Sequence, residues 1–196
     1  MSTSLWSSFL QDIYIEVPDC PVLLQTNAAR DAARVFFRDS GAWRVALPAL
    51  NVIANKTVYT LPAPTAGVIE TILAVTLNGT LLRPEQFMVG QDEDHGWRVT
   101  LATAPSQNST HGLAVAVILW PGPDDTGVPS FLRGRYGEAI SFGAKAQLMA
   151  QPTRWGNPKL SAYYQRQFDQ AVTAARIETA MGLQNAVPRM DIPEFV

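Results

Sequence analysis

The stretch QPTRWGNPKLSAYYQRQF, residues 151–168, connects two predicted helices and indicates how they pack. Asn157 is a favourable N-cap residue, and Pro158 suits the first helical position, where no backbone N–H is needed. The second helix is therefore expected to begin here. Gly182 predicts its end at Met181, because glycine often follows the last helical turn.

The aromatic residues of this stretch are predicted to form core rather than a ligand platform. Five residues of the second helix share one face and form a core-facing stripe: Tyr164, Phe168, Ala171, Val172 and Ala175. Tyr163 and Arg166 point away from that stripe. Trp155, in the loop, is expected to hold the helix pair together.

The helix before this loop is predicted to run from about residue 129 to residue 150. It contains three internal glycines: Gly134, Gly137 and Gly143. Each costs roughly 1 kcal/mol relative to alanine in a helix interior, so a compensating contact is expected. We expect that a neighbouring helix approaches closely at these positions.

A further helix is predicted from Pro21 to Asp39, with Asp19 or Cys20 as its cap and Gly41 just past its end. A shorter helix, roughly residues 5–14, is expected before it. One apolar stripe of the longer helix comprises Leu24, Ala28, Ala32, Val35 and Phe36. Another face carries Arg30, Arg34 and Arg38, which could face anionic DNA, pair with carboxylates of a neighbouring subunit or lie in solvent.

Residues 43–122 change to β-branched and aromatic runs separated by Pro, Gly and Asn, which is typical of strands. Asn78-Gly79 lies between two apolar runs and predicts a two-residue hairpin of type I′. Pro84 is expected to end the second strand or to lie at a sheet edge.

The predicted fold class is therefore α+β. A four-helix bundle, with two N-terminal and two C-terminal helices, carries an inserted antiparallel β domain and an extended C-terminal arm. The expected limits are 1–42 and 128–182 for the bundle, 43–127 for the β domain and 183–196 for the arm.

Composition excludes several classes of protein. The chain has 196 residues, 47% of them hydrophobic, and a formal net charge of -2, so it has no overall basic field for holding DNA. Cys20 is the single cysteine, which rules out an intrachain disulfide. The longest apolar run, residues 113–120, is too short to span a bilayer, and the N-terminus lacks a basic signal-peptide region. We expect a soluble protein made in a reducing cytoplasm.

Residues suited to catalysis are sparse, and no catalytic, cofactor-binding or metal-binding residue is predicted. Asp92, Glu93 and Asp94 could bind a hard cation or poise His95 for acid–base chemistry, but an acidic run that ends in Gly96 more often forms a solvated turn. Cys20 with His111 is a weaker nucleophile and base candidate, because a cysteine beside proline at a helix start is more often buried.

Several short patterns occur in a recognisable order along nearly the whole chain. They are W..F...I..EVPDCP, AARDAARVFF, a Trp after that helix, Y.LP, LNG..L.P and YGEAISFGAKAQLMAQPTRWGNPKLSAYYQRQFDQAV..AR. In this order they resemble the head-to-tail adaptor (connector) proteins of short-tailed bacteriophages, which are related in architecture to tail tubular protein A.

The resemblance implies a virion protein without catalytic activity, located at the head-to-tail interface. Such a protein forms a ring of twelve copies beneath the portal protein, continues the DNA channel and offers a platform to the tail nozzle. Double-stranded DNA passes through the lumen without sequence-specific binding. Two alternatives from other classes are a β-rich module that binds a cell-surface glycan and a cell-wall hydrolase using Asp92 or Glu93 with Asp124.

The last residues carry apolar side chains without periodicity, and Pro188 and Pro193 oppose regular helix. The resemblance assigns portal contact to this arm, and the candidate contact residues are Leu183, Val187, Arg189, Met190, Ile192, Phe195 and Val196. Two alternatives are an arm folded back on its own bundle and an arm docked on a neighbouring adaptor subunit.

Overall fold

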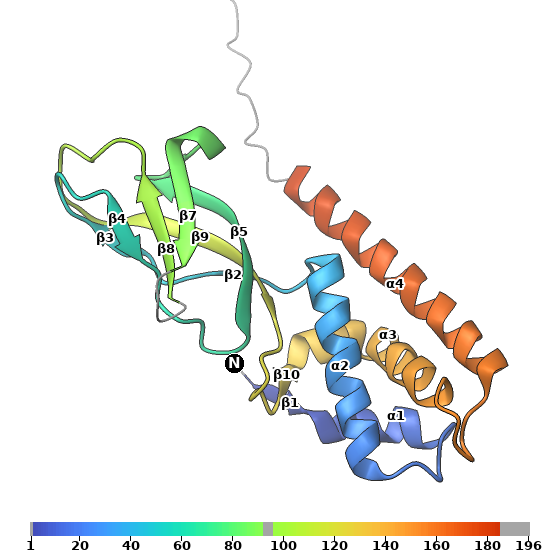
Figure 1. Ribbon diagram of the computed structural model, residues 1–196. Coiled ribbons are helices and arrows are strands. Elements are labelled where there is room, and N and C mark those ends of the chain that lie inside the picture. Colours follow the sequence, from blue (N-terminus) through green and yellow to red (C-terminus); the bar gives the residue numbers. More distant parts are fainter. Residues whose placement is uncertain (1, 92–95, 185–196) are drawn as a thin grey trace, which may run out of the picture.

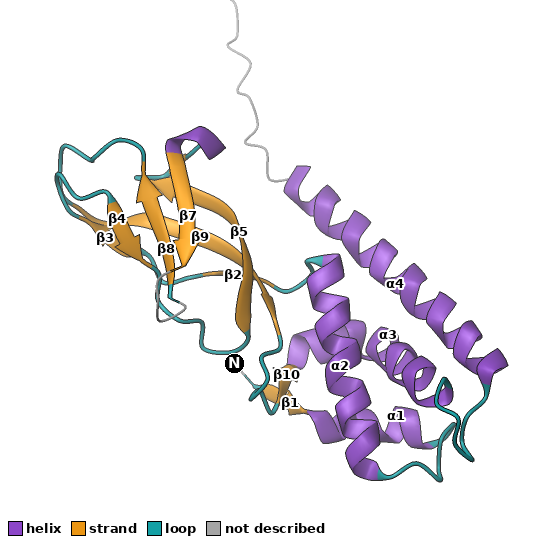
Figure 2. Ribbon diagram, viewed as in Figure 1, coloured by secondary structure: helices purple, strands orange, loops and turns teal. Residues whose placement is uncertain are grey.

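The computed structural model describes residues 2–91 and 96–184. Helices gather in one part of the molecule and most strands in another, with the short pair β1 (Thr3–Leu5) and β10 (Gly127–Pro129) beside the helices (Figures 1 and 2). This arrangement confirms the α+β class. The domain limits expected from the sequence stay a prediction.

Three long helices form the helical part. They are α2 (Val22–Ser40), α3 (Ser130–Met149) and α4 (Pro158–Gln184), and α3 packs on both of the others. The four-helix bundle is not confirmed, because the predicted helix over residues 5–14 begins as strand β1. It continues as a 3₁₀ turn, η1 (Trp6–Phe9), and only five residues form the helix α1 (Leu10–Tyr14).

Gly143 lies where the three long helices meet. A Cβ atom added there would lie 2.7 Å from the Phe168 ring of α4 and 3.0 Å from the Ala32 Cβ of α2. The predicted close approach of helices is therefore confirmed at this position. It is wrong for the other two glycines: Gly134 has no atom within 4 Å of such a Cβ, and Gly137 leaves room for the Arg133 side chain of its own helix.

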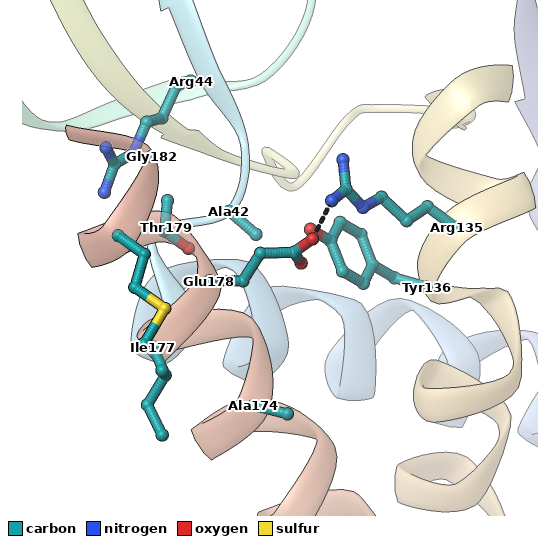
Figure 3. A pocket seen from close by; sticks show the side chains of 10 residues that line it. Ala42, Arg44, Arg135, Tyr136, Ala174, Ile177, Glu178, Thr179 and Gly182 are labelled. Carbon is teal, nitrogen blue, oxygen red and sulfur yellow. Dashed lines mark hydrogen bonds and ion pairs between the residues drawn. The ribbon is translucent and has the colours of Figure 1, made fainter. Parts of the chain in front are cut away.

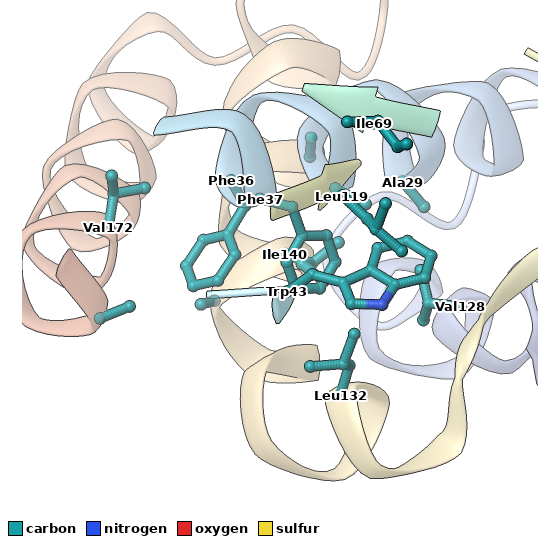
Figure 4. Close-up of a cluster of buried hydrophobic side chains, with 14 of the residues drawn as sticks. Ala29, Phe36, Phe37, Trp43, Ile69, Leu119, Val128, Leu132, Ile140 and Val172 are labelled. Carbon is teal, nitrogen blue, oxygen red and sulfur yellow. The ribbon is translucent and has the colours of Figure 1, made fainter. Parts of the chain in front are cut away.

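A cluster of aromatic rings fills the helical core and reaches the first strand of the β part (Figure 4). The Phe36 ring centroid lies 5.1 Å from that of Tyr136 and 6.1 Å from that of Phe168. The Phe37 centroid lies 5.6 Å from that of Trp43, just before β2 (Arg44–Ala46). These contacts confirm the core role predicted from the sequence.

The apolar stripe expected on α2 is only partly correct. Ala28, Ala32 and Phe36 are buried, but Leu24 is 38% exposed and Val35 46% exposed. The buried face is rotated toward Ala29, Ala33 and Phe37, because α2 packs against the strand β9 (Ser109–Trp120) as well as against α3 and α4. Gly41 ends the helix in the left-handed conformation, as predicted.

All strand pairs are antiparallel, and the long central strand is β9 (Ser109–Trp120). One sheet has the order β2-β9-β5-β6, with β3 also paired to β9, and a second sheet has the order β4-β8-β7. The strands not yet given are β3 (Leu50–Val52), β4 (Val58–Thr60), β5 (Val68–Leu77), β6 (Thr80–Leu81), β7 (Phe87–Gln91) and β8 (Trp97–Leu101).

The predicted hairpin is present between β5 and β6. Asn78 and Gly79 both have positive φ, 51° and 81°, as a type I′ turn requires. β6 ends at Leu81, and Pro84 begins a short 3₁₀ turn, η2 (Pro84–Gln86), so the second strand ends before the proline. Within the described residues, no helix is both long and apolar enough to cross a bilayer.

Candidate assembly surfaces

The residues proposed for catalysis do not come together in the described part of the chain. Cys20 is buried before α2, and burial raises the pKa of its thiol. His111 lies in β9, where its backbone N–H donates to Asn51 Oδ1 at 2.9 Å. Residues 92–95, the acidic cluster, lie outside the described residues. The residues that are described contain no group of three or more His, Cys, Asp or Glu that could hold a metal ion.

Arg34 and Arg38, two members of the predicted arginine row, contact the β part of their own chain. Arg34 Nε and Nη2 donate to the carbonyl oxygens of Pro121 and Gly122 at 3.3 and 3.2 Å. Arg38 forms an ion pair with Glu70 at 3.4 Å, and both guanidinium groups lie over the Trp120 ring.

The third member, Arg30, has a buried Nε without a hydrogen-bond partner in the described structure. Arg34 and Arg38 therefore help to fix α2 against the β part. A role in a channel or at a subunit interface stays a prediction.

The loop before α4 confirms the predicted start of that helix. Asn157 Oδ1 accepts a hydrogen bond from the Leu160 backbone N–H at 3.2 Å. The Ser161 hydroxyl donates to the Ala146 carbonyl at 2.8 Å and so ties α4 to α3. Trp155 is half-buried against the core, as expected.

α4 does not end at Met181. It continues through Gly182 to Gln184. Gly182 does not adopt the positive φ of a glycine that ends a helix. The Thr179 hydroxyl lies 3.5 Å from the Ser40 carbonyl, at the end of α2, so α4 extends past α2 (Figure 1). The last helical turns therefore have no cover from α2.

A groove of about 890 Å³ runs along this end of α4 (Figure 3). Its walls come from α4, from the first turns of α3 and from the start of β2. The residues lining it are Ala42, Arg44, Arg135, Tyr136, Ala174, Ile177, Glu178, Thr179, Met181 and Gly182. Two large apolar side chains remain open in it, Ile177 at 51% exposure and Met181 at 59%.

Charged side chains border the groove. Arg135 of α3 and Glu178 of α4 form an ion pair at the edge of the groove, and burial raises the pKa of the neighbouring Tyr136 phenol. Arg135 opposes this shift and Glu178 adds to it. The sequence analysis missed the groove, because its walls come from three segments far apart in the chain.

Two further contacts were also missed, and both shape segments quoted for the adaptor resemblance. Gln25 is 1% exposed, and its Nε2 donates to the carbonyls of Val17 and Cys20 at 3.3 and 2.8 Å, which fixes the EVPDCP loop. Arg133 reaches from α3 to Asp12 at 2.6 Å, with its guanidinium over the Phe9 ring. The sequence signal that could have predicted this role of Gln25 is its position as a single polar residue within an apolar helix face, because buried polar groups form hydrogen bonds.

Leu183 belongs to the last turn of α4. The other candidate portal-contact residues lie outside the described residues: Val187, Arg189, Met190, Ile192, Phe195 and Val196. Their predicted role is therefore untested by the structure.

Comparisons with known proteins give structural neighbours only. No protein-family model matches the chain, and no curated protein matches it. Among solved structures, a chain in the neck of a native gene transfer agent (GTA) particle, computed with C12 symmetry, is 16% identical with a TM-score of 0.29. The match covers 84% of this chain and 94% of that chain.

A second neighbour is a chain in the neck of an empty GTA particle, computed with C6 symmetry. It is 14% identical with a TM-score of 0.31, covering 84% of this chain and 95% of that chain. TM-scores near 0.3 do not establish a shared fold.

Proposed function

We propose that this protein is a structural head-to-tail adaptor of a phage-like particle. In this proposal twelve copies form a ring beneath the portal protein, extend the DNA channel and provide the attachment platform for the tail nozzle. The helical part, residues 1–42 and 128–182, forms the ring, and the β part, residues 43–127, projects from it. The arm, residues 183–196, reaches the portal.

The observation that carries the proposal is the C-terminal end of α4. It extends past α2, exposes Ile177 and Met181 beside an open groove, and leads into a segment rich in apolar residues. The folded part of the chain that the structure describes does not bury this apolar surface, so it is available to a partner. Burying apolar surface is favourable by about 25 cal/mol per Å², which would contribute to binding of an assembly partner.

The ordered sequence patterns supply the second support. The segments that resemble adaptor proteins also build the helical framework: Gln25 fixes the EVPDCP loop, Gly143 allows the three helices to meet, and Asn157 begins α4. The resemblance therefore concerns residues with structural roles rather than scattered surface positions.

The test is to mix the purified chain with purified portal rings and to image the product by electron microscopy. We expect a monomer in the absence of portal, because the ring interface is completed only on a template, and ordered rings of the chain on portal. A stable ring at low protein concentration without portal, or no association with portal, would contradict the proposal. A saccharide-binding screen of the same protein tests the glycan alternative.

A further inference from the structure

The groove beside the end of α4 contains two features that the described residues satisfy only in part. One is the apolar surface of Ile177 and Met181. The other is the guanidinium of Arg44: its Nε donates to the Gly41 carbonyl at 3.1 Å, but it forms no ion pair with any residue that the structure describes. An occupant of this groove therefore needs apolar side chains and a nearby carboxylate.

The chain itself supplies such a segment immediately beyond the groove. Met181 and Gly182 line the groove. The residues that the structure describes end two positions later, at Gln184, and are followed in the sequence by the twelve residues 185–196. Twelve extended residues span about 40 Å. Asn185 directly follows α4, and asparagine tolerates the left-handed conformation with which many helices end, so the chain is able to reverse there. The segment can thus return along α4.

The part of this segment between its two prolines fits the groove in length and pattern. On α4 the groove runs from Ala174 to Gly182, about 12 Å at the helical rise of about 1.5 Å per residue. The four residues between Pro188 and Pro193 span about 13 Å when extended. Successive side chains then alternate, so Met190 and Ile192 face the same side.

The charges of this segment also suit the groove. With Met190 and Ile192 on the apolar wall, Arg189 and Asp191 face the rim. Asp191 then supplies the carboxylate that Arg44 lacks, and a bidentate arginine–carboxylate pair fixes the register. The Arg135–Glu178 pair remains intact on the other side of the groove.

We propose that in the free chain the segment 188–193 lies in the groove of its own chain, antiparallel to the end of α4. The apolar arm is thereby covered until a partner offers a better site. Tethering to Gln184 gives the segment a high effective concentration, which favours its own groove over that of another copy. The significance of this contact for assembly rests on the proposed function, because portal binding must then displace the arm.

Disulfide trapping tests the position of the arm in portal-free protein. With Cys20→Ala as background, Ile177→Cys is combined with Ile192→Cys and exposed to oxidised glutathione. The matched control combines Ala180→Cys with Ile192→Cys, because Ala180 is exposed and lies one turn closer to the end of α4 but does not line the groove. We expect an intrachain disulfide that forms roughly tenfold faster in the groove pair than in the control.

Trypsin cleavage after Arg189 gives a second readout in a chain without new cysteines. We expect Ile177→Glu to increase this cleavage rate roughly tenfold, because the arm leaves the groove, with an unchanged circular dichroism spectrum. Leu23→Glu, a change at a residue that is 70% exposed and distant in sequence, is the control and should leave cleavage unaltered.

Equal trapping at both positions, disulfides only between chains, or unchanged cleavage in Ile177→Glu would each overturn the inference. None of these measurements uses portal, so their outcome is independent of the proposed function. If trapping and cleavage give the expected results but the chain does not assemble on portal, only the adaptor function is refuted. If the chain assembles on portal but trapping or cleavage fails, only the groove contact is refuted.

Discussion

The two halves of α4 differ in what covers their apolar side chains. From Pro158 to Ala175 the helix carries the stripe predicted from the sequence: Tyr164, Phe168, Val172 and Ala175 are buried and Ala171 is partly buried. From Arg176 to Gln184 the helix passes the end of α2, and Ile177 and Met181 remain open. The first half therefore stabilises the fold, while the second half leaves an exposed apolar surface.

This difference shows that apolar content alone does not identify the core of a helix. The first half meets α2 and α3 at small residues such as Gly143, which allow Phe168 to pack closely. The second half faces a groove that its own described chain leaves unfilled. The predictions below test whether stability depends on the first half and assembly on the second.

The largest effect is expected for Phe168→Ala. The Phe168 ring is 4% exposed and contacts the Phe36 ring, so its removal leaves a cavity and should lower the free energy of unfolding by about 3–5 kcal/mol. Urea denaturation measures this change. Ile177→Ala, in the other half, should cost less than about 1 kcal/mol, because that side chain is already half exposed. Equal losses would remove the distinction between the halves.

A matched pair of glycine substitutions tests the helix contact. Gly143→Leu should cost about 1–3 kcal/mol, because even its Cβ would lie 2.7 Å from the Phe168 ring. Gly134→Leu has open space around it and should raise stability by roughly 0.5–1 kcal/mol, since leucine favours helix over glycine. Thermal melting of both variants separates the cases, and an unchanged melting temperature in Gly143→Leu would refute close packing there.

The buried tyrosine of the first half predicts a loss of stability at high pH. Burial raises the pKa of Tyr164, and Glu16 adds to the shift, so the phenol ionises more readily in the unfolded chain. Its contribution is complete below the unfolded pKa, near 10, and is lost as pH rises through the folded pKa. Tyr164→Phe should therefore make the alkaline decline less steep. Urea midpoints measured across this range check the slope, and an identical slope would contradict the assignment.

The smallest effect is expected for the contact between α2 and the β part. A double-mutant cycle with Arg38→Ala and Glu70→Ala should give a coupling free energy of roughly 0.2–1 kcal/mol, as for other largely exposed ion pairs. A coupling of zero would show that the ion pair does not stabilise the contact between α2 and the β part.

The sequence predicted several elements that depend on local chemistry, although the cap of α2 was wrong: Pro21 is its N-cap, not Asp19 or Cys20. Asn157 and Pro158 begin α4, Gly41 ends α2, and Asn78-Gly79 forms the hairpin, because each is determined by a few adjacent residues. The core stripe of α4 was also predictable, since its spacing follows the helical period.

Contacts between distant segments were not predictable in this way. The β1–β10 pair joins residues about 125 positions apart, and a Cβ on Gly127 would collide with the Ser4 carbonyl. Gly182 retains helical geometry because exposed helix ends tolerate glycine. The groove depends on α3, α4 and β2 meeting, so no single pattern in the sequence marks it.

Removal of residues 185–196 tests the central claim most directly, that the end of α4 and its arm serve assembly rather than the fold. The truncated chain keeps every described element, and its binding to portal rings is measured beside that of the full chain, with melting and circular dichroism recorded for both. We predict unchanged helical content, a melting temperature lower by a few degrees at most because the contact in the groove is lost, and no assembly on portal rings. Unfolding of the truncated monomer, or portal binding equal to that of the full chain, would contradict the account.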